Sequence, residues 1–319
     1  MNNFKKVGLS ALAGSLAAFS VNAGEISVAG SAGMYLEHIN GGAANAGKSF
    51  SMDNQLTFTG GGELDNGLNV SVSFVIDQGD GVTATTAPFD SHSVTVSSDA
   101  FGSVTMHGEG MSSASGALDS TPSGNIWDAF QAAADEPEAA PGAVGGLSFA
   151  LPTLMDGLAL SASYTPKGTN ADSSSAFGIV YTGVEGLTLT YASGTDNNSL
   201  SSEADHTVYS AKYAMGPVTV AVMQSEYDDE VAAGDQTTDA YSIAYTVSDE
   251  LSISYGAEEL EFGVQSSSNV AAEFERIKVS YTAGGMTLTA SQATGDNVSY
   301  STAATEDREV WALGASFAF

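Results

Sequence analysis

The chain has 319 residues, a formal net charge of −30 and no cysteine. With 8 basic against 38 acidic side chains, it lacks the clustered Lys and Arg that nucleic-acid phosphates require, so we expect no nucleic-acid partner. Without disulfides, the fold must be held by backbone hydrogen bonds and packing alone.

The first 23 residues have the pattern of a secretory signal peptide. Two lysines precede a small, apolar run at Val7 to Val21, and Val21-Asn22-Ala23 fits a small-x-small cleavage site. The apolar run is too short to span a bilayer comfortably, which disfavours an anchoring helix. We therefore predict that residues 1–23 are removed and that residues 24–319 form one exported domain.

From Gly24 onward, short segments alternate between apolar and polar or small residues with the period of a strand. Segment 68–76 is a clear example, with Leu, Val, Val, Phe and Ile on even positions and mostly polar residues between them. About sixteen such segments lie near 26–34, 50–58, 68–76, 94–96, 104–106, 147–151, 158–164, 177–181, 187–191, 209–213, 218–222, 241–247, 251–255, 277–281, 286–290 and 309–319. A mean hydropathy of +0.02 suits strands that face lipid on one side and water on the other.

The connections between these segments alternate in length. Short Gly-rich or acidic turns lie at 60–67, 97–103, 155–157, 183–186, 215–217, 248–250 and 283–285. Long connections lie at 37–48, 77–90, 109–145, 165–175, 194–205, 226–237, 258–272 and 294–308. Outer-membrane barrels sort tight turns and long loops onto opposite sides, whereas a soluble sandwich has no reason to do so. The pattern predicts an all-β fold, a transmembrane antiparallel β-barrel of 16 strands.

Three stretches carry a family resemblance: Phe58-Thr59-Gly60 followed by Glu63 to Leu68, then Phe101 to Gly108, and the terminal Phe319. They resemble the general porins of Gram-negative bacteria, and the layout matches over all of 24–319. The resemblance implies a homotrimer in the outer membrane, in contact with membrane lipid and lipopolysaccharide. It also implies that Phe319 is the signal read by the barrel-assembly machinery.

In such porins the third external loop folds into the lumen, the barrel interior, and narrows the pore. Here the longest connection, 109–145, takes that place, although the family's Pro-Glu-Phe-Gly-Gly-like segment is missing. The expected constriction acids are Asp119, Asp128, Asp135, Glu136 and Glu138. Strand parity predicts these lumen-facing basic residues: His107, Lys212, Arg276, Lys278 and Arg308. We expect some of them to face the third loop.

Two other motifs have simpler interpretations. Gly42 to Ser49 fits the phosphate-binding pattern G-x-x-x-x-G-K-[ST], but the residues after Ser49 alternate like a strand instead of starting a helix. The acid clusters at 226–230 and 306–309 lack EF-hand spacing, so they are interpreted as solvated acids and not as calcium ligands. We therefore expect no cofactor and no bound metal.

The predicted function is a water-filled outer-membrane channel through which small hydrophilic solutes and ions diffuse passively. Because acids outnumber bases, a mild preference for cations is expected. No G-x-S-x-G, H-E-x-x-H or Cys nucleophile is present, so we predict no enzyme, although a scattered Ser/His/Asp site remains an alternative. Two further alternatives stay open: a solute-selective barrel with a lumen binding site, and a soluble exported adhesin or surface β protein.

Overall fold

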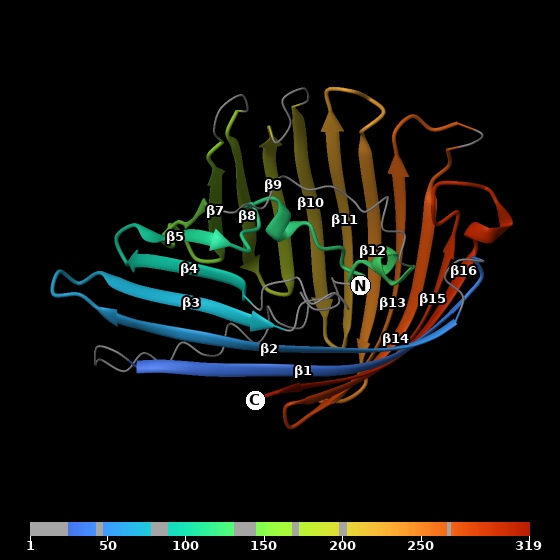
Figure 1. Ribbon diagram of the computed structural model, residues 1–319, viewed down its shortest axis with the longest axis horizontal. Helices are drawn as coiled ribbons and strands as arrows, with labels where there is room; N and C mark the ends of the chain where they lie inside the picture. Colours follow the sequence, from blue (N-terminus) through green and yellow to red (C-terminus); the bar gives the residue numbers. More distant parts are fainter. Residues whose placement is uncertain are drawn as a thin grey trace.

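The computed structural model describes residues 25–42, 47–77, 89–130, 145–167, 172–197, 203–266 and 269–319. Within them, sixteen antiparallel strands form a closed barrel in which each strand pairs with its neighbours in sequence and β16 pairs with β1 (Figure 1). Among these described residues, no helix is both long and apolar enough to cross a membrane.

The strands are long and the described helical pieces are single turns. The strands are β1 (Glu25–Asn40), β2 (Gly47–Glu63), β3 (Asn69–Asp77), β4 (Phe89–Ser98), β5 (Gly102–Glu109), β6 (Gly146–Ala150), β7 (Leu158–Thr165), β8 (Ser174–Val184), β9 (Leu187–Asp196), β10 (Ala204–Met215), β11 (Val218–Asp229), β12 (Gln236–Thr246), β13 (Leu251–Phe262), β14 (Ala272–Ala283), β15 (Met286–Asp296) and β16 (Arg308–Ala318). The 3-10 turns are η2 (Gly116–Leu118), η3 (Ile126–Phe130) and η4 (Ala304–Glu306).

The predicted sixteen-stranded antiparallel barrel is confirmed. The first hairpin is longer than expected, because Ile39 still pairs with Gly47 and only 41–46 remain as a connection instead of 37–48. Since a strand and not a helix begins at Gly47, the Gly42 to Ser49 motif lacks the helix N-terminus that a phosphate-binding loop needs. The predicted signal peptide, residues 1–23, lies outside the described residues.

The outer face of the wall is apolar over most of its height. Ile277 on β14 and Leu313 on β16 are 55% and 56% exposed, and they alternate with side chains that point inward. Large apolar side chains follow the same parity on the other strands, among them Val72, Val94, Phe177, Leu189, Tyr209, Val222, Tyr241, Ile253 and Leu288. So wide an exposed apolar surface is stable only where lipid covers it.

A row of outward carboxylates runs across the ends of β12 to β15 next to the long connections. Asp239 lies directly opposite Glu259, Glu259 opposite Glu273, and Glu273 opposite Asp296. All four side chains are exposed. Carboxylates on opposed cross-strand positions repel one another, and hydrocarbon would raise that cost further. This height of the barrel therefore lies outside the hydrocarbon layer.

The barrel is closed by backbone hydrogen bonds at the end of the chain. Phe319 N–H donates to Gly30 O at 3.0 Å, and Gly30 N–H donates to Phe319 O at 2.7 Å. The Phe319 ring occupies the space that a Cβ on Gly30 would need. A glycine in β1 thus lets the last aromatic residue lie flat on the outside of the seam.

We predict that Leu313→Arg destabilises the barrel in lipid by about 2–4 kcal/mol, because it places a charge on the lipid face near the middle of β16. The measurement is urea-induced unfolding from lipid vesicles. Ala312→Arg is the matched control, since its neighbour across β1 is lumen-facing Glu37 and it should lose far less. Equal losses in the two variants would contradict the assignment of inner and outer faces.

Candidate functional site

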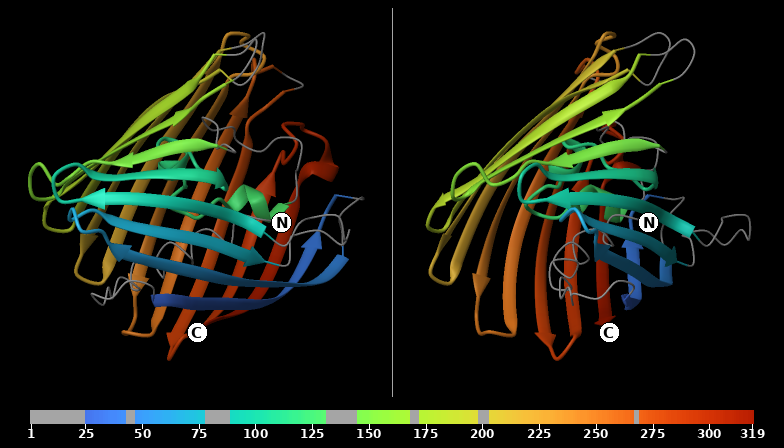
Figure 2. Two further views of the ribbon diagram at one scale, coloured as in Figure 1. Left: turned by 60° about the vertical axis from the view of Figure 1, so that its left-hand side comes forward. Right: turned by 90° about the vertical axis from the view of Figure 1, so that its left-hand side faces the viewer.

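Inside the wall lies a segment that belongs to none of the strands. Residues 110–130, here called the inner segment, leave β5 and run along the inner face of the later strands (Figures 1 and 2). Its composition prevents another strand: Thr121-Pro122-Ser123-Gly124-Asn125 combines several turn-forming residues. Gly124 and Asn125 both adopt left-handed backbone angles, with φ of +86° and +52°.

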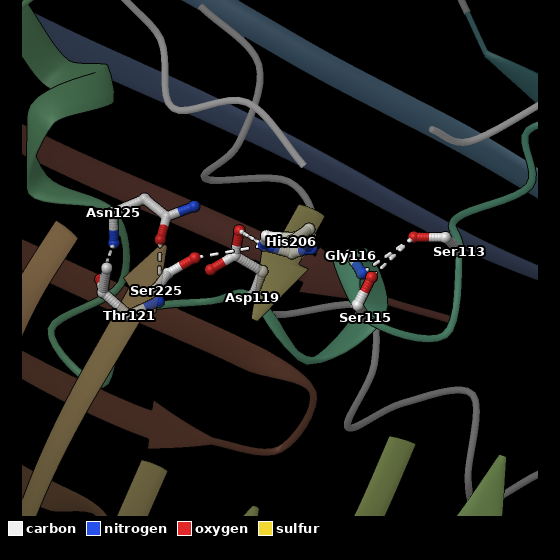
Figure 3. Close-up of polar contacts among 8 residues, drawn as sticks. All are labelled: Ser113, Ser115, Gly116, Asp119, Thr121, Asn125, His206 and Ser225. Carbon is white, nitrogen blue, oxygen red and sulfur yellow. Dashed lines mark hydrogen bonds and ion pairs between the residues drawn. The ribbon is translucent and has the colours of Figure 1, made fainter. Parts of the chain in front are cut away.

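The turn is tied by a reciprocal pair of hydrogen bonds, drawn in Figure 3. Thr121 N–H donates to Asn125 Oδ1 at 3.0 Å, and Asn125 N–H donates to Thr121 Oγ1 at 2.6 Å. Gly124 also leaves room for the Arg276 guanidinium, whose Nη2 would lie 2.9 Å from an added Cβ. The local sequence therefore produces a compact turn that the wall can hold.

The first polar anchors lie on β7 and β10, and a serine on β11 supports the second of them. Ala114 N–H donates to Ser163 Oγ at 2.8 Å. Further along, His206 Nε2 lies 3.0 Å from Asp119 Oδ2 and 3.2 Å from Ser225 Oγ, as Figure 3 shows. His206 is fully buried, so this contact is shielded from water.

The second anchor is Glu258 on β13, which is only 3% exposed. Its carboxylate accepts hydrogen bonds from the Thr121 hydroxyl, from Ser123 Oγ at 2.6 Å and from Trp127 N–H at 3.1 Å. Beside it, Arg276 on β14 donates to the backbone carbonyl oxygens of Ser123 and Gly124. Three hydrogen bonds offset the cost of burying this carboxylate. Loss of the carboxylate would leave all three donors without this acceptor.

Arg308 anchors the end of the segment. Its Nη1 donates to Phe130 O at 3.0 Å, while Nη2 donates to Glu306 Oε2 at 2.7 Å. The guanidinium thus joins the inner segment, β16 and the connection before β16.

Apolar contacts complete the attachment. Ile126, Trp127 and Phe130 of η3 are buried in a cluster with wall residues Ile39, Leu260, Ala272, Phe274, Ala293 and Val310, and with Val298 and Tyr300 of the connection before β16. Leu118 packs on a second patch, formed by Ala192, Val208, Met223 and Ala240. Burying apolar surface stabilises the packed position by about 25 cal/mol per Å². The inner segment is therefore part of the folded core.

This packing reverses the expected parity near the long-connection rim. There Leu260 and Phe274 point inward, while the adjacent Glu259, Glu261 and Glu273 point outward. The expectation that bulky apolar side chains keep to the outer face is wrong at this height. Here the inner segment covers the inner face of the wall, and the outer face lies beyond the hydrocarbon layer. The sequence shows this change in the runs Glu258 to Phe262 and Glu273 to Arg276, where the same three acidic residues take outward positions and the same two apolar residues inward ones.

The two described constriction acids both lie against the wall. Asp119 contacts His206, and Asp128 is buried within η3. Asp135, Glu136 and Glu138 lie outside the described residues. Nothing in the sequence indicated the partners His206, Ser225, Ser163 and Glu258, because a single polar residue on a strand gives no sign of what it will contact.

The five basic residues separate into two groups. Arg276 and Arg308 hold backbone carbonyls of the inner segment. His107 Nε2 lies 2.9 Å from Ser148 Oγ, Lys212 is exposed near the turn at 216–217, and Lys278 sits between Ser254 and Ser291 on neighbouring strands. None of the described ranges brings together three His, Cys, Asp or Glu side chains that could hold a metal ion.

The part of the wall made by β1 to β5 has a different character. Its inward positions carry Tyr35, Asp53, Gln55 and Asp77 together with many hydroxyl side chains, and no described inward position there holds Lys or Arg. The described hydrogen bonds from the inner segment to the wall go instead to β7, β10, β13, β14 and β16. The two sides of the lumen are thus chemically distinct.

A closed sixteen-stranded wall with an apolar outside and a segment held within is the architecture of a membrane channel. The family model described as Gram-negative porin matches residues 8–273. The chain belongs to the Gram-negative porin family. This porin forms a channel in the bacterial outer membrane. A comparison with curated proteins gives no match.

Solved structures agree on the fold of the porin. A variant of the Rh. blastica porin is 16% identical with a TM-score of 0.67, covering 92% of this chain and 100% of that one. A loop-deletion variant of OmpT, an outer membrane protein of Vibrio cholerae, is 15% identical with a TM-score of 0.65, covering 93% and 100%. At these identities the likeness establishes the barrel and says nothing about the side chains in the lumen.

We predict that Glu258→Ala loosens the inner segment, because it leaves three donors without their acceptor, at a cost of about 1–3 kcal/mol. The expected results are faster proteolysis within 110–130 and a noisier single-channel current. The matched control is Glu259→Ala on the outer face of the same strand, which should leave both unchanged. Identical digestion of the two variants would show that Glu258 does not hold the segment.

Proposed function

We propose that this porin prefers cations and that the inner segment narrows its pore. The observation that supports the preference is the use made of the basic side chains. Arg276 and Arg308 are bound to carbonyl oxygens of the inner segment, and Arg308 is also paired with Glu306. Their positive charge is directed at the inner segment and at Glu306 instead of the water-filled space.

The opposite side of the lumen supports the same proposal. On β1 to β3, Glu37, Asp53 and Asp77 point inward, and no described Lys or Arg on these strands does so. Fixed carboxylates along a pore raise the local concentration of cations and lower that of anions. The chain's net charge of −30 adds to this bias at longer range.

Narrowing by the inner segment is supported by its anchoring. A segment held by buried hydrogen bonds and by an apolar cluster occupies space that permeating solutes would otherwise use. Passage would then depend on solute width and charge, without a catalytic step and without a cofactor. Residues 24–319 would form this channel after removal of residues 1–23.

The remaining partners are proposed from the family. We propose a homotrimer surrounded by membrane lipid and lipopolysaccharide, with the outward carboxylate row at the level of the lipid headgroups. The native mass in detergent checks the trimer, and the mass of a single chain would contradict it. Phe319 is proposed as the residue read by the barrel-assembly machinery, because its exposed ring ends the seam strand.

The selectivity test removes two lumen carboxylates. We predict that Glu37→Gln combined with Asp53→Asn lowers the K⁺/Cl⁻ permeability ratio, since one charge about 10 Å away in water contributes about 0.4 kcal/mol, or about a factor of two. The measurement is the reversal potential in planar bilayers under a KCl gradient. Asp239→Asn with Glu259→Gln removes the same charge from the outer face and should change little. A chloride-selective wild type would overturn the proposal.

The assembly test uses two aromatic residues of the final strand region. We predict that Phe319→Ala reduces the fraction of chains that reach the folded, heat-modifiable form in outer membranes, because it removes the terminal ring at the seam. Phe317→Ala is the control for simple loss of an outward aromatic residue, and its yield should stay close to wild type. If both variants lose folded protein equally, Phe319 has no special role in assembly.

A further inference from the structure

An aromatic ring lies on the lumen side of β1, on the part of the wall that differs from the anchoring side. Tyr35 alternates with Met34, which is 58% exposed on the outer face, so Tyr35 points inward. Its hydroxyl donates to Asp53 Oδ2 on β2 at 3.1 Å. β1 and β2 lie side by side at the lower edge of the barrel in Figure 1.

Two glycines set the orientation of the ring. A Cβ on Gly33 would overlap the Tyr35 hydroxyl and would lie 2.7 Å from Cε2. A Cβ on Gly314 of β16 would lie 2.9 Å from Cδ1 of the same ring. The ring therefore fills the space above two side-chain-free positions and lies along the wall. Tyr35 remains partly exposed, and its exposed part is on the lumen side because the backbone of β1 and β16 lies behind it.

The position along the strand places the ring below the inner segment. Ile39, four residues further along β1, belongs to the apolar cluster that holds η3. At about 3.3 Å per residue, the Cα of Tyr35 lies about 13 Å along the strand from that of Ile39. A solute that passes the inner segment on the β1 side therefore meets the face of Tyr35.

The charges around the ring are negative. Asp53 is bonded to its hydroxyl, and Glu37 follows two residues later on the same lumen face. On the β14 side, the lumen base level with Glu37 is Lys278, in the row Lys278–Ser291–Ala312–Glu37. That row spans three strand spacings, about 14 Å in all. No adjacent base on this row therefore neutralises the two carboxylates beside the ring.

We propose that Tyr35, Asp53 and Glu37 form a binding site for small organic ammonium ions in the lumen of this channel. The ring face attracts a cation through its quadrupole, and a weakly hydrated alkylammonium loses less water on contact than K⁺ does. The two carboxylates supply the long-range attraction that brings the ion to the ring. This inference depends on the proposed cation preference but adds a defined place of binding.

The test measures block of K⁺ current by tetramethylammonium in planar bilayers. In the wild type, tetramethylammonium should reduce the current with saturation. Tyr35→Leu keeps an apolar side chain but removes the ring, and it should raise the half-blocking concentration about three- to tenfold. Tyr35→Phe keeps the ring and should stay within about twofold of the wild type. Asp53→Asn preserves shape and should also weaken the block.

A second lumen tyrosine provides the matched control. Tyr227 on β11 donates to Asp196 on β9 at 3.2 Å, but Asp196 is 9% exposed and this pair lies on the opposite part of the wall. Tyr227→Leu should leave the block unchanged. Absence of K⁺ conductance would refute the channel, and chloride selectivity would refute the cation preference. A cation-selective K⁺ channel with no block, or with equal block in Tyr35→Leu and wild type, would overturn the site alone.

Discussion

The structure depends on closing the ring of backbone hydrogen bonds. In hydrocarbon no water can satisfy an open strand edge, so every strand must have a partner on both sides. The chain meets this requirement where β16 returns to β1, and the reciprocal bonds between Gly30 and Phe319 extend the seam to the last residue. The outer face can then be apolar throughout the hydrocarbon layer, and polar chemistry is confined to the inside and to the rims.

Closure also creates an interior that must be filled or left wet, and the two sides of this barrel differ in that respect. Along β7 to β16 the wall carries buried acceptors and donors that hold the inner segment, with Glu258 and Arg276 side by side at its turn. Along β1 to β5 many inward residues are hydroxyls and carboxylates, and the Tyr35 ring packs over two glycines. The described polar anchors of the inner segment therefore lie on the β7 to β16 side, and the proposed solute contacts lie on the other.

The chain has few basic residues, and two of them, Arg276 and Arg308, hold the inner segment in place. Each of them donates to a backbone carbonyl of the inner segment. The fixed charge and planar donors of Arg suit this role better than a lysine ammonium does. In the function we propose, their engagement with the inner segment leaves the carboxylates of β1 to β3 to bias the lumen toward cations. The same residues thus shape both the packing of the interior and its electrostatics.

The sequence by itself determined the class of fold, because strand parity and the alternating lengths of connections are local patterns that a closed membrane barrel imposes on every hairpin. It also placed Arg276, Lys278 and Arg308 on the inward parity. Only the tertiary structure decided which side chains meet inside: the contacts of Asp119 with His206 and of Glu258 with Thr121 join residues 87 and 137 positions apart. Such pairs depend on the curvature of the wall and the path of the inner segment, and neither is encoded in a local period. For the same reason the flat seat of Tyr35 on Gly33 and Gly314 became visible only once β1 and β16 were side by side.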